Sequence, residues 1–180
     1  MRYVKLAVGE RRWWRFAAWA LLSLLAAQLP AKAADAGPPV RLDATSVQGR
    51  PVEPLTQQSV ARSYGQAWQD LAGAVQGDHP EFLDSNFTGA ARTQLAAMIA
   101  DQESTGVRTS YTNQRHQLKA VFYSPEGDVI ELHDTMECDL QLSDGGKVIH
   151  QEHAVLRYVV LMTPGADRWL VRQLQAVAQF

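Results

Sequence analysis

The chain has 180 residues, 17 Lys and Arg against 19 Asp and Glu, a formal net charge of −2 and a single Cys. Six of the basic residues and one acidic residue fall within residues 1–33, so the remainder has a net charge near −7. That charge repels phosphate backbones and anionic membrane surfaces, which excludes nucleic acid as an expected partner. One Cys makes no internal disulfide, so stability must come from packing.

The N-terminus has the pattern of a cleavable secretory signal peptide over residues 1–33. Five basic residues precede Phe16, and no charged residue occurs from there to Leu29. The small residues of Ala31-Lys32-Ala33 then predict cleavage before Ala34. The apolar run would cover roughly 21 Å as a helix, less than the roughly 30 Å hydrocarbon core of a bilayer. We therefore expect an exported protein, periplasmic or secreted, that is free of the membrane after cleavage.

This segment has two alternative interpretations. Retention of the apolar run would make it a membrane anchor. Arg11-Arg12 resembles the start of a twin-arginine signal, but Trp13 and Trp14 depart from the residues that usually follow. No Cys follows the apolar run, so the pattern does not predict a lipid-modified N-terminus.

Residues 34–54 contain four prolines and two glycines without an apolar period, which predicts a flexible leader. The rest, residues 55–180, has the length of one domain. Its first half is expected to be helical. Apolar residues recur at steps of three and four from about Thr56 to Gln76, which predicts an amphipathic helix. Pro80 could open a short second helix, and Asn86 or Thr88 could cap a third that ends at Gly106.

The second half changes to the two-residue period of strands. The expected strands cover about residues 115–122, 130–141, 147–162 and 169–177, and Asp144-Gly145-Gly146 is a strong hairpin signal. The sequence thus predicts an α+β fold with three N-terminal helices packed on a curved antiparallel sheet of about four strands.

This order of elements over about residues 56–178, with Arg168-Trp169-Leu170-Val171 entering the last strand, resembles the nuclear transport factor 2-like (cystatin-like) superfamily. The resemblance implies a cone-shaped sheet around a partly apolar pocket. It also implies functions that range from small-molecule isomerases and dehydratases to ligand binders, dimerisation modules and periplasmic parts of type IV secretion systems.

Asp134 is the main catalytic candidate. It lies on the apolar face of its strand between Leu132 and Met136, where lost solvation would favour a general base. In ketosteroid-isomerase-like relatives, acids that reach into the cone transfer protons. His116 falls on the apolar face of the preceding strand and would form an acid–base pair with Asp134 if the strand register brings them together. The alternative is that both residues have structural roles.

The predicted pocket-lining residues are Tyr64, Trp68, Met136 and Tyr158. Tyr64 and Trp68 lie four residues apart on the buried face of the first helix, where an aromatic stripe is also typical of an ordinary core. We expect no metal site, because the odd spacing of His150 and His153 sends them to opposite faces of a strand. No cofactor is expected, since the chain has no Gly-rich phosphate loop.

The leading functional hypothesis is a non-catalytic ligand-binding or protein-assembly module, with a small apolar ligand or a protein as partner. The alternatives are a ketosteroid-isomerase-like or dehydratase-like enzyme with Asp134 as the base, and a membrane-anchored periplasmic component of a secretion system. A homodimer is a further hypothesis.

Overall fold

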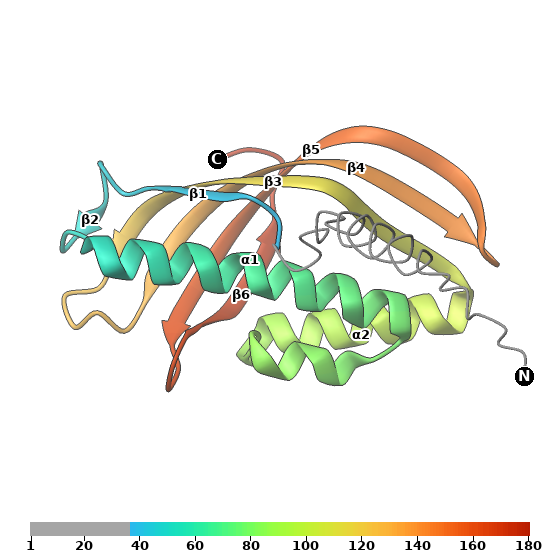
Figure 1. Cartoon of the computed structure of the whole chain (residues 1–180), viewed down its shortest axis with the longest axis horizontal. Helices are drawn as coiled ribbons and strands as arrows, with labels where there is room; N and C mark the ends of the chain where they lie inside the picture. The colour runs from blue at the N-terminus through green and yellow to red at the C-terminus, as the bar shows by residue number, and fades with distance from the viewer. Residues whose placement is uncertain (1–36) are drawn as a thin grey trace, which may run out of the picture. The chain divides into compact units, whose positions relative to one another are not determined.

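The computed structural model describes residues 37–180, so the predicted signal peptide lies outside the described residues. Two α-helices, one short 3-10 helix and six strands follow one another in this part of the chain (Figure 1). Their bounds, in chain order, are β1 (Val40–Asp43), β2 (Gln48–Gly49), α1 (Pro54–Gly77), η1 (Pro80–Ser85), α2 (Gly89–Thr105), β3 (Val107–Tyr123), β4 (Ile130–Asp144), β5 (Lys147–Pro164) and β6 (Trp169–Ala176).

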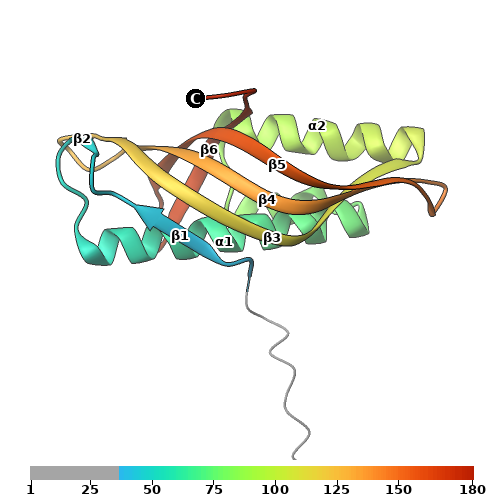
Figure 2. The ribbon, with the colours of Figure 1, turned by 90° about the horizontal axis from the view of Figure 1, so that it is seen from above.

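The strands form one mixed sheet in the order β1-β3-β4-β5-β6, and β2 also pairs with β3. The pairs β3–β4, β4–β5 and β5–β6 are antiparallel, whereas β1 and β2 run parallel to β3. β6 pairs with β5 only from Tyr158 to Pro164. Figure 2 shows β5 continuing past β6 toward the β4–β5 hairpin.

The prediction of three helices on a four-stranded antiparallel sheet is therefore wrong. The segment Pro80–Ser85 is a single 3-10 stretch, too short to form the predicted second α-helix. Two extra strands, β1 and β2, fall within residues 34–54, where the sequence predicts a flexible leader. β1 has four residues and β2 has two, so both strands are too short to show a periodic pattern. The pairing partner of β1 is also distant in sequence: Val40 lies beside His116, 76 residues later in the chain.

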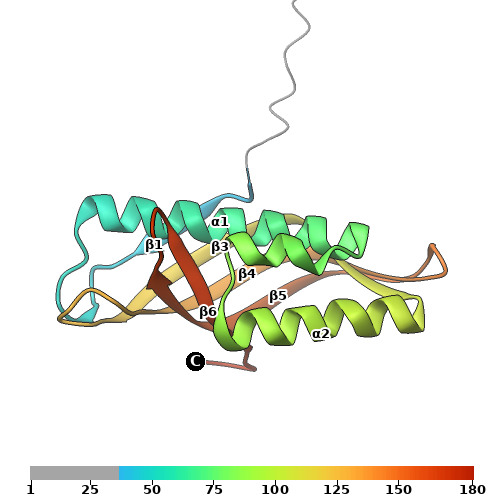
Figure 3. The same ribbon diagram turned by 90° about the horizontal axis from the view of Figure 1, so that it is seen from below.

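The helices lie together on one face of the sheet, which we call the inner face (Figures 1 and 3). The first and third predicted helices are present with nearly the predicted bounds. Gly106 follows α2 with a positive φ of 73° and donates its N–H to the carbonyl of Gln102, as expected for a glycine that ends a helix. The core between helices and sheet includes Val60, Leu71, Ile99, Leu132 and Val160.

β3 is longer than predicted because a bulge interrupts its alternation. Asn113 has a φ of 53°, and the pairing with β4 shifts between Thr112 and Arg115. Because of the bulge, residues 107–114 do not continue the two-residue alternation by which a strand is predicted from sequence. It also brings Gln114 beside His116, a contact that the site uses.

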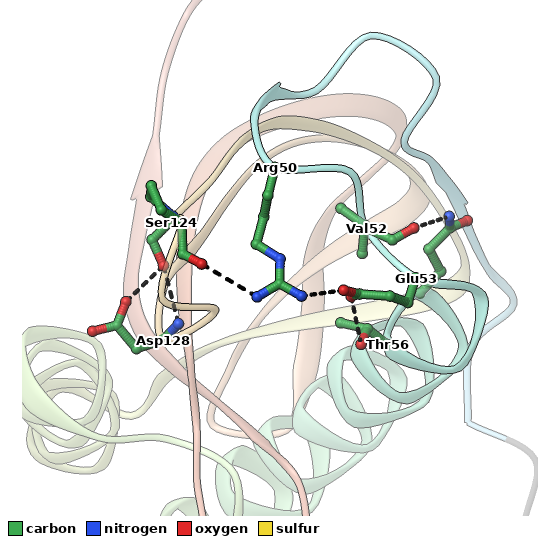
Figure 4. A network of polar contacts seen from close by, with 8 residues as sticks. Arg50, Val52, Glu53, Thr56, Ser124 and Asp128 are labelled. Carbon is green, nitrogen blue, oxygen red and sulfur yellow. Dashed lines mark hydrogen bonds and ion pairs between the residues drawn. The ribbon is translucent and has the colours of Figure 1, made fainter.

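A polar network fixes the start of α1 to the sheet at one end of the domain (Figure 4). The guanidinium of Arg50 lies over the ring of Tyr123, bonds to Glu53 and donates to the carbonyl of Pro125 in the β3–β4 turn. In the same turn, the hydroxyl of Ser124 accepts from the N–H groups of Asp128 and Val129, at 3.0 and 3.1 Å. These contacts hold α1 in place above the inner face.

The structure also bears on the question of membrane insertion. Within residues 37–180, none of the helices is both long enough and apolar enough to cross a bilayer.

Candidate functional site

Asp134 lies near the middle of β4 and points into the core. Its side chain is completely buried, and its residue pairs with Leu118 on β3 and Tyr158 on β5. The alternation of β4 predicted this direction: the neighbours Leu132 and Met136 are also buried on the inner face. The chain thus places a carboxylate where water does not solvate it.

His116 makes the predicted contact with Asp134. The Nδ1 atom of His116 lies 2.8 Å from Oδ2 of Asp134, and both side chains are completely buried. The other ring nitrogen, Nε2, lies 3.4 Å from Oε1 of Gln114. A carboxylate oxygen accepts hydrogen bonds, so the Nδ1–H group of His116 is the donor to Asp134.

Tyr64 on α1 completes the cluster. Its hydroxyl donates to the same carboxylate oxygen, Oδ2 of Asp134, at 2.8 Å. Burial, together with the charge of Asp134, raises the pKa of Tyr64 well above its usual value, so the phenol keeps its proton and remains a donor. The second oxygen of Asp134, Oδ1, is buried without a hydrogen-bond partner among the described residues. We call Tyr64, His116 and Asp134 the buried triad.

Aromatic rings close the space around the triad. The indole of Trp68 lies 4.9 Å from the His116 ring, and the ring of Tyr64 meets that imidazole edge-on at 5.4 Å, measured between ring centres. The ring of Tyr158 also packs against Trp68, with 5.5 Å between the ring centres, and burial raises the pKa of Tyr158 above its usual value. A general base must lie within hydrogen-bond reach of a substrate proton. Here, Oδ2 of Asp134 already accepts hydrogen bonds from two protein donors, Tyr64 and His116.

A surface hollow is lined in part by Trp68, the residue that packs against His116 of the triad. It has a cavity volume of about 110 Å³ between α1, α2 and β3, and its wall includes Trp68, Leu71, Met98 and Tyr111. A second, more open hollow of about 350 Å³ shares Trp68 and Tyr111 with the first. We call the two together the Trp68 cleft.

Of the four predicted pocket-lining residues, Trp68 alone lines this cleft. Tyr64 and Met136 are completely buried, and Tyr158 is 9 % exposed behind Trp68. Gln114 lines both hollows and contacts His116, so it links the cleft to the triad. Sequence reasoning missed Gln114 and Tyr111, because both lie in the part of β3 whose alternation the bulge disturbs.

A third hollow, of about 500 Å³, lies where Arg41, Lys119 and His133 meet Phe180. The ring of His133 stacks on that of Phe180, with 4.2 Å between the ring centres. Neither Asp134 nor His116 lines any of these three hollows.

The other titratable groups singled out in the sequence are dispersed. His150 lies near Glu152, and His153 near Asp139 on the opposite face of the sheet. Within residues 37–180, no three His, Cys, Asp or Glu side chains are grouped so that they could hold a metal ion. Cys138 is buried on the inner face, and burial raises the pKa of its thiol.

Comparison of the sequence with protein-family models and with curated proteins finds no match. Among solved structures, the chain is similar to the intermembrane-space region of the chloroplast protein ARC6, with a TM-score of 0.54 and 15% identity over 65% of this chain and 92% of that one. A de novo designed β-sheet protein aligns with a TM-score of 0.34 and 13% identity, over 67% of this chain and 88% of that one. The first likeness is one of fold, and the nuclear transport factor 2-like resemblance remains a prediction.

Proposed function

We propose that this chain is an exported, non-catalytic domain that acts by binding a protein partner in an assembly outside the cytoplasm. The observation that carries this proposal is the closure of the buried triad. The only carboxylate that the sequence offers as a base is completely buried, accepts from Tyr64 and His116, and lines none of the three hollows.

The ketosteroid-isomerase-like alternative has less support for the same reason. Asp134 lines none of the three hollows, so none of them gives a substrate direct access to its Oδ2 atom. The triad instead has the features of a structural network: two donors meet one acceptor between a helix and two strands.

The size of the Trp68 cleft favours a protein over a small-molecule ligand. Pockets that enclose a small ligand usually measure about 300–1,000 Å³. The smaller hollow beside Trp68 measures about 110 Å³, and its larger neighbour, of about 350 Å³, is more open to solvent than a pocket that encloses a ligand. A single apolar side chain of a partner fits that space better than a whole ligand. The solved relative also supports the proposal in a general way, since it is a region of a larger protein that lies between two membranes.

In-cell photo-crosslinking tests the proposal. A photoreactive amino acid would replace exposed apolar residues on different parts of the domain, for example Leu55, Phe82 and Ile149. We expect at least one position to give a discrete adduct with a different polypeptide in the exported fraction. An enzymatic role is tested separately with the purified protein on a panel of cyclic enones. Turnover that Asp134→Asn abolishes would refute the non-catalytic assignment.

A further inference from the structure

The face of the sheet opposite the helices, which we call the outer face, carries a hollow lined mainly by polar side chains. It has a volume of about 500 Å³, and we call it the outer hollow. Figure 2 shows this face from outside. The outward side chains of the hollow come from β1, β3 and β4 and include Arg41, Asp43, Gln117, Lys119, His133 and Thr135. The sheet separates them from the buried triad, which lies on the inner face.

The register of the strands explains why these side chains meet. One row of paired residues crosses the sheet from β1 to β5 and consists of Arg41, Gln117, Thr135 and Arg157. In the next row, Lys119 lies opposite His133. These residues alternate along their strands with the buried Leu118 and Asp134, so their side chains point to the outer face. Neighbouring strands lie about 4.8 Å apart, so roughly 14 Å separate the two Arg residues of the row.

The cations of these two rows have no carboxylate partner. Within residues 37–180, Arg41, Lys119 and Arg157 form no ion pair, whereas five other Arg side chains do. Asp43 lies opposite Lys119, but its Oδ1 atom accepts from the N–H and the hydroxyl of Thr45 instead, at 2.9 and 2.7 Å. The same residues 37–180 contain 11 basic and 17 acidic residues, a net charge of −6. A group of unpaired cations is therefore the opposite of what the composition favours.

The outer hollow also offers an apolar wall and neutral donors. The ring of Phe180 stacks on His133, yet 53 % of the Phe180 residue is exposed. Between the two Arg residues of the row, Gln117 contributes an amide and Thr135 a hydroxyl. Amides and hydroxyls donate to carboxylates, as guanidinium and ammonium groups do. The chemistry of the hollow thus suits an anionic ligand that has some apolar surface.

We infer that the outer hollow binds an acidic segment of the protein partner, with its carboxylates directed at Arg41, Lys119 and Arg157. This inference rests on the proposed function, because it names the surface through which the partner is recognised. An extended segment rises about 3.3 Å per residue, so acidic residues four positions apart lie roughly 13 Å from each other. That spacing is close to the one between the two Arg residues of the row.

The outer face favours a short acidic segment over other anions. Glu131 and Glu137 also point to this face, on either side of the β4 residues that line the hollow. A bilayer or a nucleic acid large enough to cover the face would meet these carboxylates and the net negative charge, whereas a short segment meets the hollow alone. A single small anion would reach only part of the row, because its two Arg residues lie three strands apart.

A model peptide tests the inference with the purified exported protein. The probe is a fluorescent peptide of about twelve residues in which Glu and Ser alternate, and fluorescence anisotropy measures its binding. We expect saturable binding at about 10 mM salt that weakens at about 150 mM, because the Debye length falls from roughly 30 Å to roughly 8 Å. The same peptide with Gln in place of Glu should not bind. On binding of the Glu peptide, the backbone amide NMR signals of Gln117, Lys119 and Thr135 should shift.

Charge-neutralising variants test the site itself. Arg41→Gln/Lys119→Gln should weaken binding of the Glu peptide by about fivefold or more, since exposed ion pairs are individually modest. Arg62→Gln/Lys147→Gln is the matched control: it removes two cations that also form no ion pair within residues 37–180, but that do not line the hollow. We expect this control to bind like the wild type. Circular dichroism melting verifies that both double variants are folded.

Three results would overturn the inference. The first is equal binding by the two double variants, and the second is a set of amide shifts that lies outside the outer hollow. The third is binding of inorganic phosphate, or of phosphatidylglycerol vesicles, at least as tight as that of the peptide, which would assign the hollow to a small anion or to a membrane. Photo-crosslinking separates this failure from that of the proposed function. Adducts that persist in Arg41→Gln/Lys119→Gln would retain a protein partner and overturn this site, whereas a lack of adducts from every position would refute the proposed function.

Discussion

Removing the hydroxyl of Tyr64 tests whether the buried triad stabilises the fold. In Tyr64→Phe, the ring that packs against His116 and Trp68 stays, and Asp134 loses one of its two donors. A hydrogen bond to a charged group contributes about 1.5–3 kcal/mol, so we expect a loss of about 2 kcal/mol in the free energy of unfolding. For a domain of this size, that corresponds to a fall of about 4–8 °C in Tm.

Urea titration followed by circular dichroism measures this loss, and calorimetry gives the Tm. Tyr123→Phe is the matched control: Tyr123 is 4 % exposed, and its hydroxyl makes no hydrogen bond with the described residues. We expect that control to change stability by less than about 0.5 kcal/mol.

A second background separates the hydrogen bond from the packing of the ring. In an Asp134→Leu background, the Tyr64 hydroxyl would be buried without its acceptor, so Tyr64→Phe should be neutral or stabilising there. The structural interpretation of the triad would be refuted if Tyr64→Phe had the same effect with and without the carboxylate, or no effect in the wild type.

Five further predictions follow, the first four from local features. Gly106→Ala should destabilise the fold by about 1–2 kcal/mol in urea titrations, because Gly106 has a φ of 73°. Gly73→Ala, inside α1 and with ordinary van der Waals space for a methyl group, should instead stabilise it by roughly 0.5–1 kcal/mol, and a loss would contradict that packing. The hydrogen bond from Arg108 lowers the pKa of Asp78, so the stabilising contribution of this ion pair should be lost as pH falls below about 4. Asp78→Asn should flatten this part of the curve of unfolding free energy against pH. An unchanged curve would show that Asp78 does not cause the acid loss of stability. Because the pKa of Tyr64 is raised in the folded state, its hydrogen bond should contribute fully to the free energy of unfolding below about pH 10 and lose this contribution as pH rises further. The urea midpoint of Tyr64→Phe should therefore decline less at alkaline pH than that of the wild type. Finally, N-terminal sequencing of the exported protein should begin at Ala34, whereas a start at Met1 would favour an anchored form.

The sequence predicted the site better than it predicted the sheet. Strict alternation in β4 put Asp134 on the inner face, and the same rule in β3 put His116 beside it. The contact with Tyr64 could not be predicted, because the angle at which α1 crosses the sheet depends on packing across 70 residues of chain. The bulge at Asn113 could not be predicted either, because a positive φ at an Asn does not change the hydrophobic pattern of the sequence in a recognisable way.

The two missed strands have a different cause. Residues 40–43 look like a polar linker because proline flanks them and only Val40 and Leu42 alternate. They become a strand because the edge of β3 offers unpaired backbone groups from His116 to Lys119. Short parallel strands of this kind are specified by their partner rather than by their own residues.

The pairing pattern also constrains when the chain can fold. β1 lies beside β3, Tyr64 bonds to Asp134, and the N–H of Trp169 donates to the hydroxyl of Ser63, 106 residues earlier. Such distant contacts form late, and they slow folding. Ser63 in α1 gains its hydrogen bond to β6 only after residue 169 has been made. A chain built in this way cannot complete its fold until β6 has been synthesised.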